Sequence, residues 1–190
     1  MTLDALLSDV RACRQCVDIL QPRPVLRLAP GSRVLVIGQA PGSRVHASGK
    51  PWDDASGAHL CEWLGVDRER FDDPSCFGIL PMAFCYPGKG KSGDLPPPPV
   101  CSTLWHGTLQ EHLKEARLTL LIGQYAQRHY LGRERKSSLT ETVRAFADYG
   151  PKRFPLPHPS WRSCIWMQRN PWFAEQVLPV LQQRVAAALR

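Results

Sequence analysis

The chain has 190 residues, of which 43% are hydrophobic and 22% charged. This composition is typical of a globular domain that can bury a core without disulfides. Apolar runs of four to six residues exclude a transmembrane helix, and the N-terminus has no apolar signal-peptide core. We therefore expect a cytoplasmic protein that does not bind membranes. The net charge of +7 favours a polyanionic partner.

The first part of the chain predicts two helices and two strands. Leucine and valine recur at helical spacing over 3–11 and predict a short amphipathic helix. The apolar run over 33–37 predicts a buried strand. A helix is expected over 54–64, ending at Gly65 as a left-handed cap. The segment 77–82 predicts the second strand.

The second part continues the alternation after a long irregular loop between Cys85 and Cys101. This loop is too rich in proline and glycine for regular structure, and loops of this length are usually functional or held by another group. Further helices are expected over 103–115, 123–132, 138–147 and from Asn170, and further strands over 118–122 and 153–156. The pattern predicts a single α/β domain over residues 1–190, a three-layer αβα sandwich with a central, mostly parallel four-stranded sheet.

The seven cysteines indicate metal or cluster binding rather than disulfides, because we expect a cytoplasmic location. Cys13 and Cys16 form a C-x2-C pair, and Cys85 and Cys101 flank the irregular loop. The remaining three lie in apolar or aromatic surroundings and are interpreted as packed thiols: Cys61, Cys76 and Cys164.

The segment 33–57 (RVLVIGQAPGSRVHASGKPWDDASG) is the first candidate for a ligand site. Its strand ends at Gly38 in a loop rich in glycine and proline, and open α/β sheets bind ligands beyond the carboxyl ends of their strands. Arg44 and Lys50 lie in this loop, and further basic residues surround His158 after the last predicted strand. We expect this positive charge to gather on one face.

Three segments at predicted strand ends together resemble the uracil-DNA glycosylase superfamily: GQAPG (38–42), IGQYAQRHYLG (122–132) and HPSWRS (158–163). The resemblance covers nearly the whole chain and is closest to the family 4 type, which holds a [4Fe-4S] cluster. It implies four cluster ligands, the last two separated by fifteen residues: Cys13, Cys16, Cys85 and Cys101. A structural zinc ion on the same cysteines and four unliganded thiols are the alternatives.

The resemblance implies a monofunctional enzyme of base excision repair that flips uracil out of DNA and releases it by hydrolysis. His158 matches the residue that stabilises the leaving base, and Trp52 matches the aromatic residue that stacks on it. The backbone of Gly38, Gln39 and Ala40 would shape the base pocket. The alternatives are a surface histidine at 158 and a packed tryptophan at 52.

Two features depart from the family pattern. Asp53 and Asp54 replace valine and glycine, and either could orient the attacking water. Asp53 ranks first, because Asp54 could instead cap the following helix. Pro81 stands where family 4 has the asparagine that reads the uracil edge. The preferred base could therefore be hypoxanthine or another damaged base, or the chain could be a catalytically weak iron–sulfur protein that binds DNA.

The resemblance also implies a DNA-binding surface beyond His158, on single- or double-stranded DNA. Trp161 could enter the minor groove as a wedge, or it could pack on the terminal helix together with Trp166. Polar and basic residues would contact the phosphates: Ser160, Arg162, Arg169, Arg44 and Lys50. A nucleotide-binding protein is disfavoured, because the first loop lacks G-x-G-x-x-G and a P-loop lysine.

Overall fold

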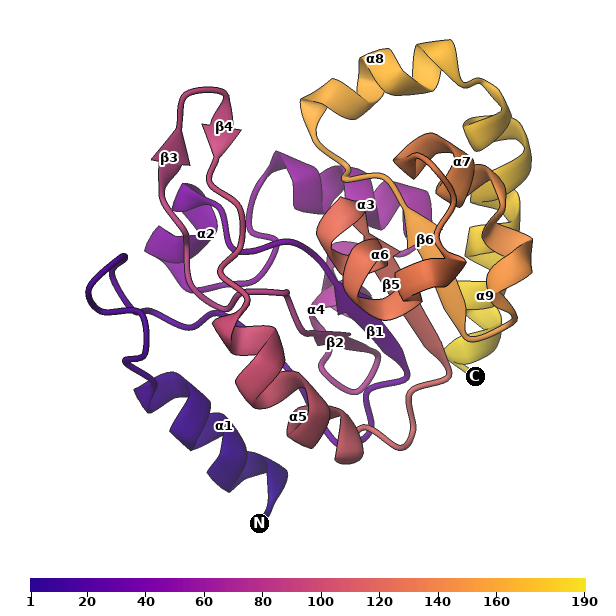
Figure 1. Ribbon diagram of the computed structural model, residues 1–190. Helices are drawn as coiled ribbons and strands as arrows, with labels where there is room; N and C mark the ends of the chain where they lie inside the picture. Colours follow the sequence, from indigo (N-terminus) through magenta and orange to yellow (C-terminus); the bar gives the residue numbers. More distant parts are fainter.

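A computed structural model describes residues 1–190. A four-stranded sheet lies between two layers of helices (Figure 1), which confirms the predicted three-layer α/β fold. All strand pairs of this sheet are parallel, in the order β2-β1-β5-β6. The strands are β1 (Val34–Ile37), β2 (Phe77–Ile79), β5 (Leu118–Ile122) and β6 (Arg153–Leu156). None of the helices combines the length and the apolar character that a membrane-spanning helix needs.

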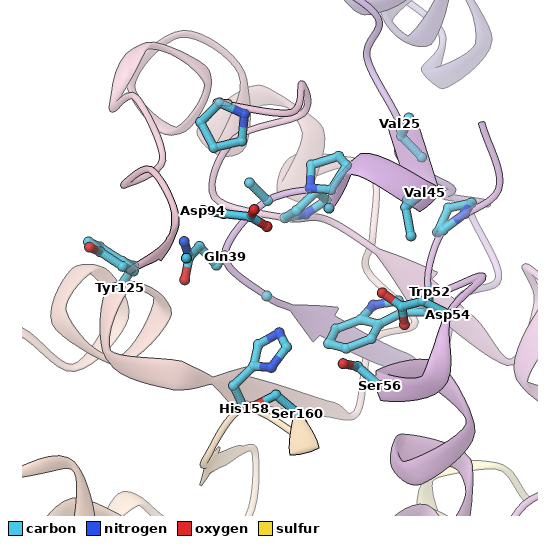
Figure 2. Close-up of a pocket in the computed structure, with 18 of the residues that line it drawn as sticks. Val25, Gln39, Val45, Trp52, Asp54, Ser56, Asp94, Tyr125, His158 and Ser160 are labelled. Carbon is cyan, nitrogen blue, oxygen red and sulfur yellow. The ribbon is translucent and has the colours of Figure 1, made fainter. Parts of the chain in front are cut away.

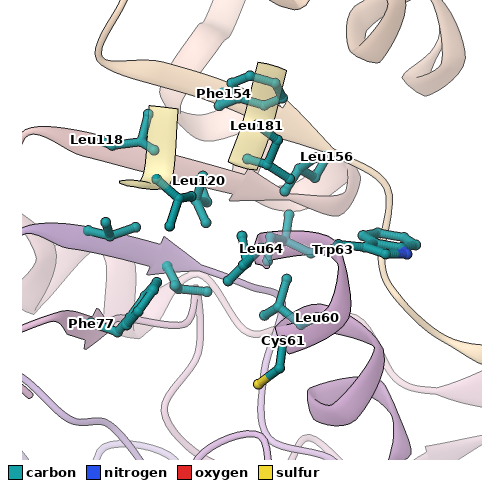
Figure 3. Close-up of a cluster of buried hydrophobic side chains, with 14 of the residues drawn as sticks. Leu60, Cys61, Trp63, Leu64, Phe77, Leu118, Leu120, Phe154, Leu156 and Leu181 are labelled. Carbon is teal, nitrogen blue, oxygen red and sulfur yellow. The ribbon is translucent and has the colours of Figure 1, made fainter. Parts of the chain in front are cut away.

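The two faces of β1 belong to two separate cores, because successive side chains of a strand point to opposite faces. Val34 and Val36 pack with α3 (Ala55–Leu64) and α9 (Leu178–Ala188) in the core shown in Figure 3. Leu35 and Ile37 pack in the other core, which includes residues of α1 (Leu3–Ala12), α5 (Gly107–Glu111) and α6 (Gly123–Leu131). The fully apolar pattern of β1 follows from burial on both sides.

Several predicted helices are present with small changes at their ends. The helix expected over 54–64 is α3, with Asp54 as its N-cap and Gly65 in the left-handed conformation at its end. The helix expected over 103–115 is shorter and begins as a π-helical segment, η1 (Ser102–His106), before α5. The helices expected over 3–11 and 123–132 are α1 and α6. The last two predicted helices correspond to α7 (Leu139–Arg144) with the 3-10 turn η3 (Phe146–Tyr149), and to η4 (Phe173–Val177) with α9.

The second strand is shorter than predicted because Pro81 ends the pairing. Leu80 still donates its backbone N–H to Val36 O (3.0 Å), but proline has no N–H with which to continue. The next donor, Met82, bonds to Gly38 O (2.9 Å). The chain after β2 is thus tied to the loop that follows β1.

Several short elements were not predicted from the sequence. The segment 85–101, expected to be irregular, contains a hairpin of β3 (Lys89–Gly90) and β4 (Gly93–Asp94). Glycines allow it, since Gly88 and Gly93 have φ values of 99° and 137°. The other unpredicted elements are α2 (Ser43–Ser48), α4 (Arg68–Asp72), η2 (Gly132–Glu134) and α8 (Trp161–Arg169).

Candidate active site

A cavity of about 580 Å³ opens beyond the carboxyl ends of the central strands. Figure 2 shows side chains from both halves of the chain facing it. Its volume lies in the range of ordinary small-molecule sites. Its walls come from the loop after β1, the start of α3, the β3–β4 hairpin, the start of α6 and the chain after β6, and they include Gly38, Gln39, Ala40, Trp52, Asp54, Pro81, Asp94, Tyr125, His158 and Arg162.

The loop after β1 is shaped to receive an aromatic ring. A Cβ added to Gly38 would lie 3.1 Å from Cζ2 of Trp52, so only glycine lets the indole approach this closely. The next residue, Gln39, is held by its own carbonyl, which accepts from Ala83 N (3.0 Å). The sequence-predicted pocket residues Gly38, Gln39 and Ala40 all line the cavity.

Trp52 is held in a strained backbone conformation. Its φ of 56° makes it the one non-glycine residue with positive φ, which costs energy for a bulky side chain. Arg68 fixes the segment by donating from Nη1 to Trp52 O (2.6 Å) and from Nη2 to Pro51 O (3.2 Å). A Cβ at Gly57 would overlap the same carbonyl oxygen of Trp52. Strain that the surroundings enforce in this way is typical of functional sites.

His158 follows β6 between two buried prolines, Pro157 and Pro159. Its imidazole lies against the indole of Trp52, with ring centroids 5.6 Å apart and planes inclined by 27°. Burial lowers the pKa of His158, although the carboxylates of Asp54 and Asp94 act in the opposite direction. The imidazole is therefore neutral near pH 7, with one N–H available as a hydrogen-bond donor.

The two aspartates predicted as candidates occupy different positions. Asp54 lines the cavity, but its Oδ1 also accepts from Gly57 N (2.9 Å) and caps α3. Asp53 is not among the residues that line the cavity. Of the two aspartates, it is therefore Asp54, ranked second from the sequence, that lines the cavity. Asp54 also caps α3.

The rim of the cavity is formed by the start of α8. Ser160, Trp161 and Arg162 line it, and Trp161 is 68% exposed. Trp166 behaves differently, because it packs edge-on against Trp172 and Phe173. Trp161 is therefore exposed, as a wedge requires, whereas Trp166 packs near the terminal helix as the alternative expected.

Three predicted DNA-contacting residues, Arg44, Lys50 and Arg169, do not line the cavity. Lys50 is instead paired with Asp72 (Nζ to Oδ2, 2.6 Å). Asp72 also pairs with Arg68, the residue that holds the Trp52 backbone. Lys50 therefore belongs to the group of charged side chains that supports the Trp52 backbone.

The four predicted cluster ligands line a second, small cavity of about 20 Å³: Cys13, Cys16, Cys85 and Cys101. Backbone N–H groups point at two of the sulfur atoms, from Arg23 to Cys85 Sγ (3.3 Å) and from Phe84 to Cys101 Sγ (3.4 Å). No group of three or more His, Cys, Asp or Glu side chains is arranged to hold one metal ion.

Five polar residues that line the main cavity were not predicted as site residues: Ser56, Ser92, Asp94, Gln124 and Tyr125. Gln124 and Tyr125 come almost directly after β5, so the rule that ligands bind beyond strand ends could have found them. No strand was predicted before Asp94, because the segment 85–101 was expected to be irregular. Its place in the cavity wall depends on the β3–β4 hairpin that forms there.

A comparison with known families agrees with this geometry. The model of the uracil DNA glycosylase superfamily matches residues 27–182. The chain belongs to the uracil-DNA glycosylase superfamily. The matched range contains Trp52, His158 and all the other residues that line the main cavity except Val25. It leaves out the pair Cys13 and Cys16, so the family match does not test the cluster.

Proposed function

We propose that this protein is a DNA glycosylase that releases a damaged base from DNA by hydrolysis. The observation that carries the proposal is the pairing of Trp52 with a neutral His158 at the wall of a strand-end cavity. A flipped base needs an aromatic surface for stacking and a donor for the charge that it acquires as it leaves. Membership of the superfamily supports the same activity.

His158 would act on the leaving base. When the bond between the sugar and the base breaks, its electron pair stays with the base, whose carbonyl oxygen becomes negative. A neutral imidazole N–H beside that oxygen stabilises the charge, and one such donor is typically worth about 3 kcal/mol. No lysine lines the cavity, which supports a monofunctional enzyme that uses water as its nucleophile.

Recognition of the base depends on groups other than Pro81. The side chain of Pro81 has no hydrogen-bonding atom, and its carbonyl oxygen is already bonded to Nε2 of the buried His106 (3.0 Å). Gln39 and Gln124 are the two side-chain amides that line the cavity, and Nε2 of Gln39 is directed toward Leu95 O (3.4 Å). Uracil is the first candidate, and hypoxanthine or another damaged base is the second.

The DNA would lie across the basic surface around the cavity. The net charge of +7 favours the phosphate backbone, and the exposed Trp161 could fill the space that the flipped base leaves. Arg162 beside it, together with Ser160, Arg44, Lys50 and Arg169, would contact phosphates. We further propose that the protein acts as a monomer.

We infer that the four cysteines around the small cavity hold a [4Fe-4S] cluster. Each thiolate of such a cluster binds a different iron atom, whereas four ligands of one zinc ion must lie within about 2.3 Å of a single point. The four cysteines line one small cavity, and the backbone N–H groups directed at Cys85 and Cys101 would stabilise thiolate ligands there. The resemblance to the family 4 type favours the cluster over zinc. Its contribution would be structural, joining the N-terminal segment to the segment 85–101.

Base release from defined oligonucleotides tests the proposed function. Single- and double-stranded substrates with uracil, hypoxanthine or xanthine are incubated with the protein, and abasic sites are then cleaved with alkali. We expect cleavage of at least one substrate, and a loss of 100-fold or more in His158→Ala, about 3 kcal/mol. His112→Ala, a partly buried histidine outside the main cavity, is the matched control. DNA binding without cleavage of any substrate would instead support the catalytically weak DNA-binding protein.

A further inference from the structure

The β3–β4 hairpin is fixed against the main cavity by hydrogen bonds to three parts of the chain. The bonds are Gln39 Nε2 to Leu95 O (3.4 Å), Arg162 Nη2 to Ser92 O (3.0 Å) and Tyr86 Oη to Asp94 Oδ1 (3.2 Å). The donors come from the loop after β1, from α8 and from the chain before the hairpin. The hairpin is therefore a wall of the cavity, positioned by the same elements that form the other walls.

Asp94, at the end of β4, directs a carboxylate toward the cavity. Its Oδ1 accepts from Tyr86, whereas Oδ2 forms no hydrogen bond or ion pair. A Cβ added to Gly42 would lie 3.7 Å from this Oδ2, which places the free oxygen beside the loop after β1. Figure 2 shows Asp94 and His158 on different sides of the same space.

The other nearby carboxylates are less free. Asp54 uses Oδ1 to cap α3, so its side chain is held by the helix that it begins. Asp53 does not line the cavity. Asp94 is the one carboxylate on the wall that has a hydroxyl to orient it and a second oxygen without a partner.

We propose that Asp94 is a catalytic residue that accepts a proton from the water that attacks the sugar. This inference rests on the glycosylase function proposed above. The water oxygen bonds to the anomeric carbon of the sugar as the bond from that carbon to the base breaks. The electron pair of the broken bond leaves with the base, stabilised by the N–H of His158. One proton of the water passes to Asp94 and from there to solvent.

The charge of Asp94 is otherwise unfavourable at this position. A carboxylate on the DNA-facing side of a chain with a net charge of +7 repels phosphates and weakens binding. During hydrolysis the sugar becomes positive, and a nearby carboxylate then stabilises the transition state. The proposal thus predicts opposite effects on DNA affinity and on the chemical step when the charge is removed.

The test is Asp94→Asn, which keeps the shape of the side chain and an oxygen that can accept from Tyr86. We expect the single-turnover rate of base release to fall about 10²–10⁴-fold, the usual contribution of a general base. Affinity for an undamaged duplex, measured by fluorescence anisotropy, should stay the same or increase. Asp94→Glu should retain more activity than Asp94→Asn. The control is Asp9→Asn, an exposed carboxylate on α1, which should behave as wild type.

The possible results separate the two proposals. If the wild-type chain releases base and Asp94→Asn stays within threefold of it, the role of Asp94 is wrong and the glycosylase function stands. A large loss in Asp54→Asn with none in Asp94→Asn would assign the water to Asp54 instead. If Asp94→Glu is as slow as Asp94→Asn, proton acceptance by this carboxylate is also wrong. A wild-type chain without activity on any damaged base overturns both proposals.

Discussion

The indole of Trp52 lies face to face with the imidazole of His158, with ring centroids 5.6 Å apart. A third flat ring between them would need about 7 Å, twice the contact distance of about 3.5 Å between carbon atoms. A base therefore cannot enter this stack as it stands. Either the two rings separate when a base binds, or the base stacks on another part of the indole.

Replacing Trp52 tests whether its ring supports the base. We expect Trp52→Ala to reduce the single-turnover rate of base release about 10- to 100-fold, since stacking on a base is worth about 1–3 kcal/mol. Trp52→Phe should stay within about threefold of wild type, because it keeps an aromatic face. Equal rates for the alanine and phenylalanine variants would show that the ring does not stack on the base.

Gly57 should be intolerant of any side chain. Gly57→Ala forces a Cβ against the carbonyl oxygen of Trp52, and we expect it to displace Trp52 and reduce base release at least tenfold, a cost of about 1.4 kcal/mol or more. The matched control is Gly107→Ala, an exposed helical position with nothing within 4 Å of a new Cβ. That substitution should stabilise the protein by about 0.5–1 kcal/mol. Thermal unfolding and base release measure both variants.

Gln127 holds together the two strand ends that carry the site. It is fully buried, and its Nε2 donates to Leu121 O (3.2 Å) and to Leu156 O (2.9 Å), the latter two residues before His158. Gln127→Met should lower the free energy of unfolding by about 1–3 kcal/mol, because both carbonyls lose their donor. The unpaired Oε1 of Gln127 limits the loss, since methionine removes this buried acceptor too.

Base release should slow in the same variant, because Leu156 leads directly into the His158 loop. The control is Gln183→Met on the exposed face of α9, where we expect no change. Denaturant unfolding gives the stability of each variant. Unchanged stability in Gln127→Met would contradict the role of these two hydrogen bonds.

Part of the free energy of unfolding depends on pH through the carboxylate of Asp72. Burial alone would raise the pKa of Asp72, but hydrogen bonds from Arg68, Lys50 and Arg27 outweigh it and lower the pKa to about 2. The carboxylate therefore stabilises the fold at pH values above its ordinary pKa of about 3.9, and this contribution is lost as the pH falls toward 2. We expect Asp72→Asn to cost about 2 kcal/mol at pH 7, and the difference from wild type to shrink below pH 4.

An exposed aspartate provides the comparison for this effect. Asp148 pairs with Lys136 at 2.7 Å, but its side chain is 57% exposed, and surface pairs contribute little. Asp148→Asn should change the free energy of unfolding by less than about 0.5 kcal/mol at any pH. A cost for Asp72→Asn that does not vary between pH 7 and pH 3 would contradict the pKa assigned to Asp72.

The cysteine cavity predicts which thiols retain iron. Wild-type protein purified without oxygen should contain iron and show the visible absorbance of a cluster. Cys101→Ser should lose both, whereas Cys164→Ser, which changes an exposed cysteine outside the cavity, should keep them. Zinc at one ion per chain with no iron would favour the structural zinc site.

The sequence predicted the sheet because its strands are short apolar runs bounded by glycine or proline, as at Gly38. It predicted Trp52 and His158 as parts of one site because both follow strand ends. It did not predict that Asp94 joins them, since the position of the hairpin depends on contacts from Gln39 and Arg162 that are distant in the chain. It also gave no sign of the strain at Trp52, because Arg68 and not a local motif imposes it.

The strand order β2-β1-β5-β6 divides the chain at the middle of the sheet, between β1 and β5. The chain before the connection at 112–117 supplies β1, β2 and the pocket wall with Trp52 and Asp94, and the chain after it supplies β5, β6 and the wall with His158. A break in that connection would therefore produce two fragments, neither of which contains a complete pocket. If mixing the two fragments restored base release, this would show that they had associated and that β1 had paired with β5 again.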